Sequence, residues 1–280
     1  MTCAALILNY NGRGLLGPLY DSLVEQDDLT AICLIDNAST DDSVAFTKGH
    51  YPSVEIIQNS ENLNFGTAYN QAIRNRSEDV IFIVNNDVVV HRGAIRNALK
   101  FLEKNPDVAS VSFEGLDPKH GGSFGASCPP LRRFGKELSP GRSFRGPNDP
   151  PVESPCYLWG AACCVRREVF RKIEFDEEMD WGFEDIDLGW SIARQTGMRN
   201  VFLPSATIFH VTSHTSRKRF YSREINQMVT QNAVLSFAKN ATRTELLRAM
   251  PYILANFVRY PGRGSLARQF LNRLKARLKQ

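Results

Sequence analysis

The short apolar run at Val80–Val84 constrains the fold of this chain more than any other stretch. It is too short for a helix and too apolar for a strand with one face in water, so it predicts a strand buried on both faces in a parallel sheet. The run stops at Asn85, Asn86 and Asp87. Because ligands bind beyond the carboxyl ends of such strands, we expect Asp87 to lie in a crevice. The alternative is a simple turn, for which Asn-Asn-Asp is equally suited.

Further apolar runs alternate with segments that repeat apolar residues at helical spacing. This alternation predicts βαβ units, and therefore an α/β fold with a mostly parallel central sheet flanked by helices. The expected strands span 4–8, 31–35, 54–57, 80–84 and 108–111, and the expected helices span 15–24, 65–74 and 93–103. Three of these strands end in amide or acidic residues: Asn9 and Asn11, Asp36 and Asn37, and Asn85 and Asp87.

The following part of the chain contains a long loop and a second group of carboxylates. Residues 115–155 are rich in Gly, Pro, Ser and Arg and lack periodicity, so we expect a flexible flap over the site. A buried strand is expected at 156–165, and short strands at 201–203 and 206–209 lead to His210. A helix begins near Asp185. The helix dipole partly explains the carboxylates at its start, which are Glu184, Asp185 and Asp187.

Length and composition fit one α/β domain with an extension. The 280 residues include six cysteines that form no Cys-x-x-Cys pair, which indicates a reducing compartment and no disulfide framework. We recognise no signal peptide at the start, and no apolar run approaches the roughly 20 residues of a membrane span. We expect a cytoplasmic protein that has no nucleic-acid partner.

Charge is distributed unevenly along the chain. Residues 217–280 carry 14 Lys and Arg against 2 Asp and Glu, whereas residues 1–216 carry 20 against 28. We therefore expect a domain at 1–216 and a basic helical extension at 217–280. An apolar stripe at one-turn spacing runs through the last helix: Leu266, Phe270, Leu274 and Leu278. Such basic amphipathic helices are typical of anionic membrane surfaces, so we expect the stripe to dock at the inner face of the cytoplasmic membrane. A solvated basic tail is the alternative.

Several motifs, in this order and spacing, resemble those of the family 2 glycosyltransferases, in particular the rhamnosyltransferase-like and galactofuranosyltransferase-like branch. They are Leu8–Gly12, Ile35–Ser43, Asn85–Asp87, Gly160–Arg167, Phe175–Glu177, Glu184–Leu188 and His210. The resemblance covers roughly residues 4–215 and implies a GT-A (Rossmann-like) fold and a metal-dependent, inverting glycosyltransferase. The implied donor is a nucleotide diphosphate sugar, either dTDP-rhamnose-like or a UDP-sugar. The implied acceptor is a hydroxyl of a glycan or a lipid-linked glycan.

The resemblance also implies roles for residues at the family's positions. Asp36 stands where the donor base is read, and Asp185 stands where the general base is found. Asp87 stands at the metal position of the D-x-D-type motif, and His210 at that of a second ligand to Mg²⁺ or Mn²⁺. The implied donor-binding set is Asn9, Asn11, Asp36, Asn37, Asn85, Asn86 and Asp87. The implied acceptor-binding set is Trp181, Glu184 and Asp187.

Elementary chemistry agrees with these roles. A divalent cation neutralises the charge of a diphosphate leaving group, and a carboxylate base that deprotonates a sugar hydroxyl contributes about 10²–10⁴-fold. The chain departs from the family at 64–72, which keeps Phe65 and Asn70 but lacks most of the usual glycines. The alternatives are a catalytically inactive nucleotide-sugar-binding module and a nucleotidyltransferase. The absence of Gly-x-Gly-x-x-Gly after the first strand argues against an oxidoreductase.

Overall fold

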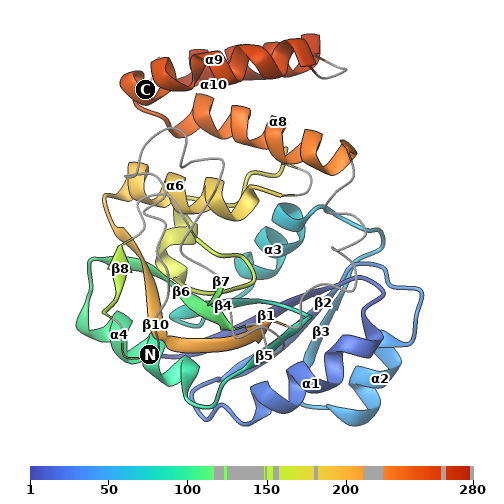
Figure 1. Ribbon diagram of the computed structural model, residues 1–280. Helices are drawn as coiled ribbons and strands as arrows, with labels where there is room; N and C mark the ends of the chain where they lie inside the picture. The colour runs from blue at the N-terminus through green and yellow to red at the C-terminus, as the bar shows by residue number, and fades with distance from the viewer. Residues whose placement is uncertain are drawn as a thin grey trace.

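The computed structural model describes residues 1–116, 123–124, 148, 150–153, 158–179, 182–210, 223–259 and 263–277. In this part of the chain, strands form one sheet with helices on both of its faces (Figure 1). The strands are β1 (Cys3–Asn9), β2 (Ala31–Asp36), β3 (Glu55–Gln58), β4 (Val80–Asn85), β5 (Val88–Val90), β6 (Val108–Leu116), β7 (Ser123–Phe124), β8 (Val152–Glu153), β9 (Ala162–Arg166) and β10 (Arg199–His210). The helices are α1 (Arg13–Val24), α2 (Ser43–His50), α3 (Phe65–Arg74), α4 (Ala94–Lys104), the 3₁₀ helix η1 (Arg167–Arg171), α6 (Glu184–Thr196), α8 (Arg223–Asn240), α9 (Arg243–Arg259) and α10 (Arg263–Arg277).

The strand order is β3-β2-β1-β4-β9-β6-β10-β5. The first four strands are mutually parallel, as is the β6–β10 pair, whereas β9 runs antiparallel to both of its neighbours and β5 runs antiparallel to β10. The predicted α/β fold with a largely parallel sheet is thus confirmed, with β9 as an antiparallel strand inside the sheet and β5 as an antiparallel strand at its edge. The two short strands expected at 201–203 and 206–209 form a single strand, β10, whose register shifts between Leu203 and Thr207.

Strand β4 lies at the centre of the sheet and is buried on both faces, as its sequence predicts. Val80–Val84 are completely inaccessible to solvent. Phe82 and Val84 pack into the apolar cluster beneath α1 and α4, while Ile81 and Ile83 pack into the cluster beneath α3 and α6. Burying each side chain of this size stabilises the fold by about 1.5–3 kcal/mol. The buried strand therefore fixes the position of the polar residues that follow it.

The predicted flap at 115–155 lies largely outside the described residues, as does the predicted boundary between 216 and 217. Two short described pieces of the flap region, β7 and β8, belong to the sheet. β7 pairs with the end of β6, and β8 pairs with β10.

The C-terminal helices extend the fold in layers away from the sheet. Helix α8 lies over α6, and α9 and α10 lie beyond α8 (Figure 1). A third apolar cluster joins these helices and contains Trp190, Phe237 and Ile253. Leu266 and Phe270 are buried in this cluster, Leu274 packs against it, and Leu278 lies outside the described residues. The expectation that this stripe faces a membrane is therefore wrong, because the described part of the stripe packs against protein.

Polar contacts also attach α8 to α6. The carboxylate of Asp187 on α6 is completely buried and pairs with Lys239 on α8, with 2.7 Å between Oδ2 and Nζ. Its other oxygen accepts hydrogen bonds from Ser236 Oγ at 2.7 Å and from Asn240 Nδ2 at 2.9 Å. Burial lowers the pKa of Lys239, but the charges of Asp187 and Asp176 outweigh it and raise that pKa overall. Lys239 therefore remains charged and holds the two elements together.

We expect Lys239→Met to lower the free energy of unfolding by about 3–5 kcal/mol, because it leaves the buried carboxylate of Asp187 without its cation. Urea denaturation followed by circular dichroism measures the effect. Lys275→Met, at an exposed position of α10, is the matched control and should leave stability unchanged. The double variant Lys239→Met/Asp187→Asn should recover part of the loss. Equal denaturation midpoints for Lys239→Met and Lys275→Met would contradict this prediction.

Candidate active site

Three neighbouring parallel strands bring their polar carboxyl ends to one edge of the sheet. In the β1–β2 pair Asn9 stands opposite Asp36, and in the β1–β4 pair Leu8 stands opposite Asn85. The residues that the sequence places at separate strand exits are thus side by side. Asn85 is half-buried, and its backbone N–H donates to the carbonyl of Ala161 at 3.0 Å.

Asn9 is the centre of a hydrogen-bond network at this edge. Its Nδ2 donates to Asp36 Oδ1 at 3.4 Å and to Ser39 Oγ at 3.2 Å, and its Oδ1 accepts from Asn86 Nδ2 at 2.9 Å. Asp36 is buried, and its second oxygen accepts the N–H of Ser39 at 3.1 Å. A Cβ at Gly12 would collide with Asn86 Nδ2 and Asn9 Oδ1, so a larger residue there would displace these amides. The network links the Asp36 carboxylate, through the side chain of Asn9, to Asn86 in the β4–β5 turn.

Asn11 and Asn37 shape the surrounding loops. Asn11 adopts a left-handed conformation with φ of 51°, and its Oδ1 accepts the N–H groups of Thr40 at 2.7 Å and Asp41 at 3.2 Å. The side chain of Asn37 is buried and makes four hydrogen bonds, to Asn59, to Asn62 and to both backbone groups of Leu63. Asn37 therefore holds the loop after β3. These hydrogen bonds use the side-chain amide oxygen and nitrogen of Asn37, which a contact with the donor would also need.

Asp87 and His210 meet although they are 123 positions apart in the sequence. Asp87 lies in the turn between β4 and β5, and β5 pairs with the end of β10, where Val88 stands opposite His210. The His210 Nε2 lies 3.1 Å from Asp87 Oδ1. A carboxylate and an imidazole so arranged fit two of the ligands of a divalent cation such as Mn²⁺. Among the described residues we find no group of three or more His, Cys, Asp or Glu side chains that could hold a metal.

The dipeptide Trp159-Gly160 connects this pair with the carboxylates of α6. The Trp159 ring meets the His210 ring edge-on, with 5.9 Å between centroids. The N–H of Gly160 donates to Asp185 Oδ2 at 2.9 Å, and a Cβ at Gly160 would lie only 3.0 Å from the Cβ of Asp185. The two adjacent residues thus link His210, which contacts Trp159, with Asp185, which contacts Gly160. Trp159 is not among the predicted site residues, and its signal in the sequence is an aromatic residue and a glycine directly before a buried strand.

Glu184 and Asp185 form a pair of unequal carboxylates at the start of α6. Burial raises the pKa of Asp185, whose oxygens accept the N–H groups of Gly160 and Ile186. Burial and the adjacent charge of Asp185 raise the pKa of Glu184 to about 8. Glu184 Oε2 is buried and has no hydrogen-bond partner among the described residues. Glu184 is therefore the member of the pair that keeps its proton near neutral pH.

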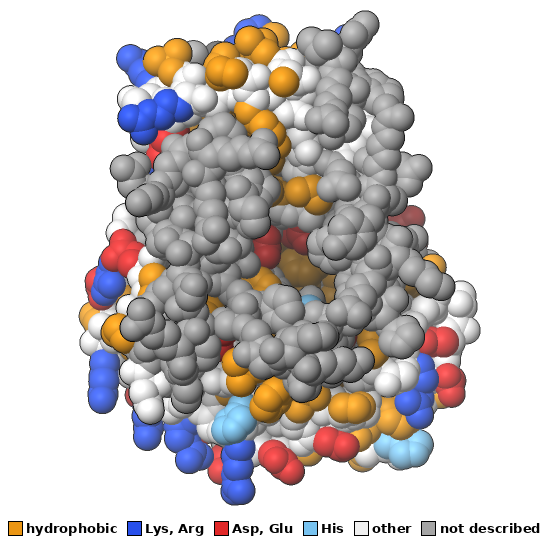
Figure 2. Space-filling model, viewed as in Figure 1, with side chains coloured by type: hydrophobic (Ala, Val, Ile, Leu, Met, Phe, Trp, Pro, Cys, Tyr) orange, Lys and Arg blue, Asp and Glu red, His pale blue; other side chains and the backbone are white. Residues whose placement is uncertain are grey.

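The predicted acceptor-binding residues do not share one environment. Glu184 lies beside Asp185, Asp187 points away and is bound to α8, and Trp181 is outside the described residues. The predicted acceptor contact of Asp187 has no support in this geometry, because Ser236, Lys239 and Asn240 occupy its carboxylate. Figure 2 shows acidic and hydrophobic side chains at the bottom of a hollow in the middle of this face of the molecule.

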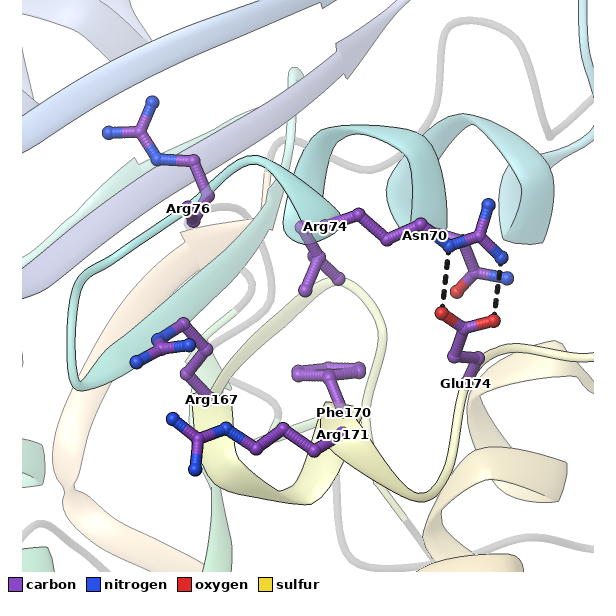
Figure 3. Close-up of a pocket in the computed structure, with 8 residues that line it drawn as sticks. Asn70, Arg74, Arg76, Arg167, Phe170, Arg171 and Glu174 are labelled. Atoms are coloured by element: carbon purple, nitrogen blue, oxygen red, sulfur yellow. Dashed lines mark hydrogen bonds and ion pairs between the residues drawn. The ribbon is translucent and has the colours of Figure 1, made fainter.

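A second hollow, of about 390 Å³, lies near the opposite edge of the sheet, where β4 begins. It is lined by basic side chains: Arg74, Arg76, Arg167 and Arg171 (Figure 3). Much of this charge is neutralised within the protein. Arg74 forms a bidentate pair with Glu174, and Arg76 pairs with Glu55 and Glu78. We assign this hollow no ligand, since Arg74 and Arg76 are already paired with carboxylates of the protein.

Parallel strands that end together in acidic and amide side chains are typical of the nucleotide-binding edge of an α/β enzyme. The chain belongs to glycosyl transferase family 2, whose family model matches residues 5–173. It is 28% identical over 211 residues to an N-acetylglucosaminyl-diphospho-decaprenol L-rhamnosyltransferase of Mycobacterium tuberculosis, a match that covers 66% of this chain and 68% of the relative. The resemblance read from the sequence motifs is thus confirmed at the level of the family.

Solved structures show the same fold at lower identity. A mannosyltransferase of Pyrobaculum calidifontis in complex with GDP-Man and Mn²⁺ has a TM-score of 0.64 at 20% identity, covering 98% of this chain and 74% of that one. TarS of S. aureus in complex with UDP-GlcNAc has a TM-score of 0.63 at 14% identity, covering 98% and 80%. In the described part of this chain, we find no helix with the length and hydropathy needed to span a membrane.

Proposed function

We propose that this protein transfers a sugar, with inversion, from a nucleotide diphosphate sugar to a hydroxyl of a glycan or lipid-linked glycan. The observation that carries the proposal is the continuous path from the Asp87–His210 pair through Trp159 and Gly160 to Asp185. This chain of contacts supports the pairing of a candidate metal site with a candidate base. The name of the mycobacterial relative supports rhamnose as the sugar, from a dTDP-rhamnose-like donor, and a lipid-linked diphosphate glycan as the acceptor. A UDP-sugar is the rival donor.

Asp36 is the proposed reader of the donor's base. Its buried carboxylate is held by Asn9 and by the N–H of Ser39, so it keeps one orientation at the carboxyl end of β2. A fixed acceptor of hydrogen bonds suits the N–H groups on the edge of a nucleotide base. The amide of Asn9 joins this position to the turn at Asn86, which brings the base and diphosphate positions into one network.

Asp87 and His210 would hold the divalent cation, Mg²⁺ or Mn²⁺. When bound, such a cation neutralises the charge that develops on the diphosphate leaving group. Asp87 lies in the turn between β4 and β5 and His210 at the end of β10, and their 3.1 Å hydrogen bond keeps them together in the free protein. Only one of them is a carboxylate, so metal affinity without the donor should be low, because few protein oxygens are available to a hard cation.

Asp185 is the proposed general base. It accepts the proton of the acceptor hydroxyl while that oxygen forms a bond to the anomeric carbon and the bond from that carbon to the diphosphate breaks. The N–H of Gly160 orients the carboxylate, and protonated Glu184 adds no competing charge beside it. Attack from the face opposite the diphosphate inverts the configuration at the anomeric carbon. The base is expected to contribute about 10²–10⁴-fold to the rate.

The segment at 64–72, which lacks most of the family's glycines, is attached to the segment before α6. Asn70 donates to the carbonyl of Phe175 at 2.9 Å and accepts its N–H at 3.0 Å, and Gly66 packs against the same residue. Asn64 caps α3 by accepting the N–H of Thr67. Gly66, Asn64 and Asn70 thus fasten α3 to the segment before α6.

Four buried cysteines in the described residues are free thiols: Cys3, Cys33, Cys163 and Cys164. Free buried thiols suit a reducing compartment. We therefore propose that transfer takes place in the cytoplasm, with the acceptor presented at the membrane.

A donor panel tests the proposed function. We would incubate the protein with dTDP-rhamnose, UDP-galactose, UDP-galactofuranose or UDP-N-acetylglucosamine, with Mg²⁺, with Mn²⁺ or with a chelator, and measure released nucleotide diphosphate. We expect release from one donor to depend on the metal and to increase when a glycan acceptor is added. Binding of a donor without release under every metal condition would favour the alternative, a catalytically inactive nucleotide-sugar-binding module.

We expect Asp36→Ala to weaken the binding of the free nucleoside diphosphate and of the full donor equally, by about tenfold or more, because a hydrogen bond to a charged group is worth about 1.5–3 kcal/mol. Isothermal titration calorimetry measures both affinities. Asp42→Ala is the matched control, since Asp42 is an exposed carboxylate in the same loop whose side chain makes no capping hydrogen bond to α2. A loss restricted to the sugar-bearing donor would show that Asp36 does not read the base.

A further inference from the structure

Helix α9 is apolar on two opposite faces. Its inward face buries Ala249 and Ile253 in the third apolar cluster. Its outward face carries Leu247, Pro251 and Leu254, which are exposed and, at spacings of four and three residues, lie along one side of the helix. Leu247 is 72% exposed and Leu254 is 54% exposed. A helix that is apolar on both sides is typical of an element with a second apolar environment.

Exposed hydrophobic side chains concentrate in this outermost layer. Isolated apolar residues are common on protein surfaces, so clustering is the informative feature. Of the large hydrophobic side chains that are exposed in the described residues, three lie on α9 and α10, namely Leu247, Leu254 and Leu271. The two helices pack on each other through Phe257 and Phe270, with 5.6 Å between ring centroids. Figure 2 shows hydrophobic and basic side chains together at this end of the molecule.

The charge around these leucines has one sign. Helices α9 and α10 contain eight Lys and Arg residues and a single carboxylate, Glu245. That carboxylate is already paired with Arg194 on α6 at 2.6 Å. Arg273 is used inside the protein, where it pairs with Asp176. Exposed basic side chains remain next to the apolar ones: Arg248, Arg268 and Lys275.

We propose that the outward face of α9, with Leu247, Pro251 and Leu254, together with exposed Leu271 on α10, docks on an anionic membrane surface. Apolar side chains enter the boundary between headgroups and acyl chains, while the flanking Arg and Lys side chains meet anionic headgroups. This surface is distinct from the stripe at 266–278, whose described leucine and phenylalanine face inward. The inference goes beyond the proposed reaction, since it concerns where the enzyme works and not which sugar it transfers.

Vesicle co-sedimentation tests this surface. We would compare wild-type protein with Leu247→Glu/Leu254→Glu on vesicles of phosphatidylcholine alone and of phosphatidylcholine with about 30% phosphatidylglycerol, which gives the vesicle surface a negative potential. We expect the wild type to bind the anionic vesicles and to lose binding at least tenfold on neutral ones. The double variant should bind the anionic vesicles at least tenfold more weakly than the wild type. Val24→Glu is the matched control, because Val24 is 52% exposed on α1 and should not affect binding.

Further measurements separate this inference from its rivals. Leu247→Glu/Leu254→Glu should retain the wild type's release of nucleotide diphosphate with a water-soluble acceptor, so a loss of vesicle binding alone is attributable to the surface. The inference is overturned if the double variant binds anionic vesicles as the wild type does, or if the wild type does not bind them. It is also overturned if light scattering shows a wild-type dimer that the double variant converts to a monomer, since the face would then be a protein interface.

Discussion

Asp185→Asn is expected to lower turnover by about 100-fold or more while donor affinity stays almost unchanged. The substitution keeps the size of the side chain but removes its ability to accept a proton. The amide oxygen can still accept the N–H of Gly160, which now bonds Asp185 Oδ2 at 2.9 Å, so the start of α6 should keep its place. Single-turnover kinetics with saturating donor, together with calorimetry of donor binding, would separate the chemical step from binding.

Glu184→Gln is the matched control for this prediction. Glu184 has a pKa of about 8 and is therefore largely protonated at pH 7, where a neutral amide resembles it in charge and shape. We expect Glu184→Gln to keep turnover within about threefold of the wild type at pH 7, because it removes no base, and to act mainly on acceptor affinity. If Glu184→Gln abolished turnover and Asp185→Asn did not, the base would have been assigned to the wrong member of the pair.

Sequence patterns predict the strand exits well because two independent signals coincide there. An apolar run such as Val80–Val84 identifies a buried strand, and a polar residue directly after it identifies the end that faces a ligand. Parallel pairing then brings Asn9, Asp36 and Asn85 to one edge without further information. The antiparallel direction of β9 is not predictable in this way, because an apolar run indicates a strand buried on both faces but not the direction in which that strand runs.

The three carboxylates at the start of α6 show where sequence patterns are insufficient. Glu184, Asp185 and Asp187 all satisfy the preference of a helix start for negative charge. Neighbouring residues on a helix point about 100° apart, so the three cannot all face one crevice. The carboxylate that points away from the crevice is Asp187, because it binds Lys239, which lies 52 residues later in the chain. A contact of this kind is a property of the tertiary packing and leaves no local signal.

The apolar stripe of the last helix illustrates the same limit. A one-turn repeat of apolar residues shows that one face of a helix is to be covered, but not by what. Here α8 and α9 cover Leu266 and Phe270, so the pattern that is typical of a membrane surface describes an internal contact. The exposed apolar residues of α9 could not be separated from its buried ones, because both faces of that helix carry leucine or isoleucine.

The second large effect is expected at Asp87. Asp87→Asn should lower transfer by about 10³-fold and remove most of the metal-dependent part of donor binding. Charge neutralisation by a bound cation is worth several kcal/mol, and each 1.4 kcal/mol corresponds to a factor of ten. The asparagine keeps the size of the side chain, so the turn between β4 and β5 should be preserved. Only the formal charge at the candidate metal position is removed.

Calorimetry of nucleoside diphosphate binding with and without Mn²⁺ distinguishes a metal ligand from a residue that only supports the turn. We expect Asp87→Asn to bind the metal-free nucleotide as the wild type does, and to gain little when Mn²⁺ is added. His210→Ala removes the imidazole whose Nε2 lies 3.1 Å from Asp87 Oδ1, and should cause a smaller loss of the same kind because the carboxylate remains. If Mn²⁺ strengthened nucleotide binding equally in the wild type and in Asp87→Asn, Asp87 would not be the metal ligand, and its contact with His210 would serve only to join β4 to β10.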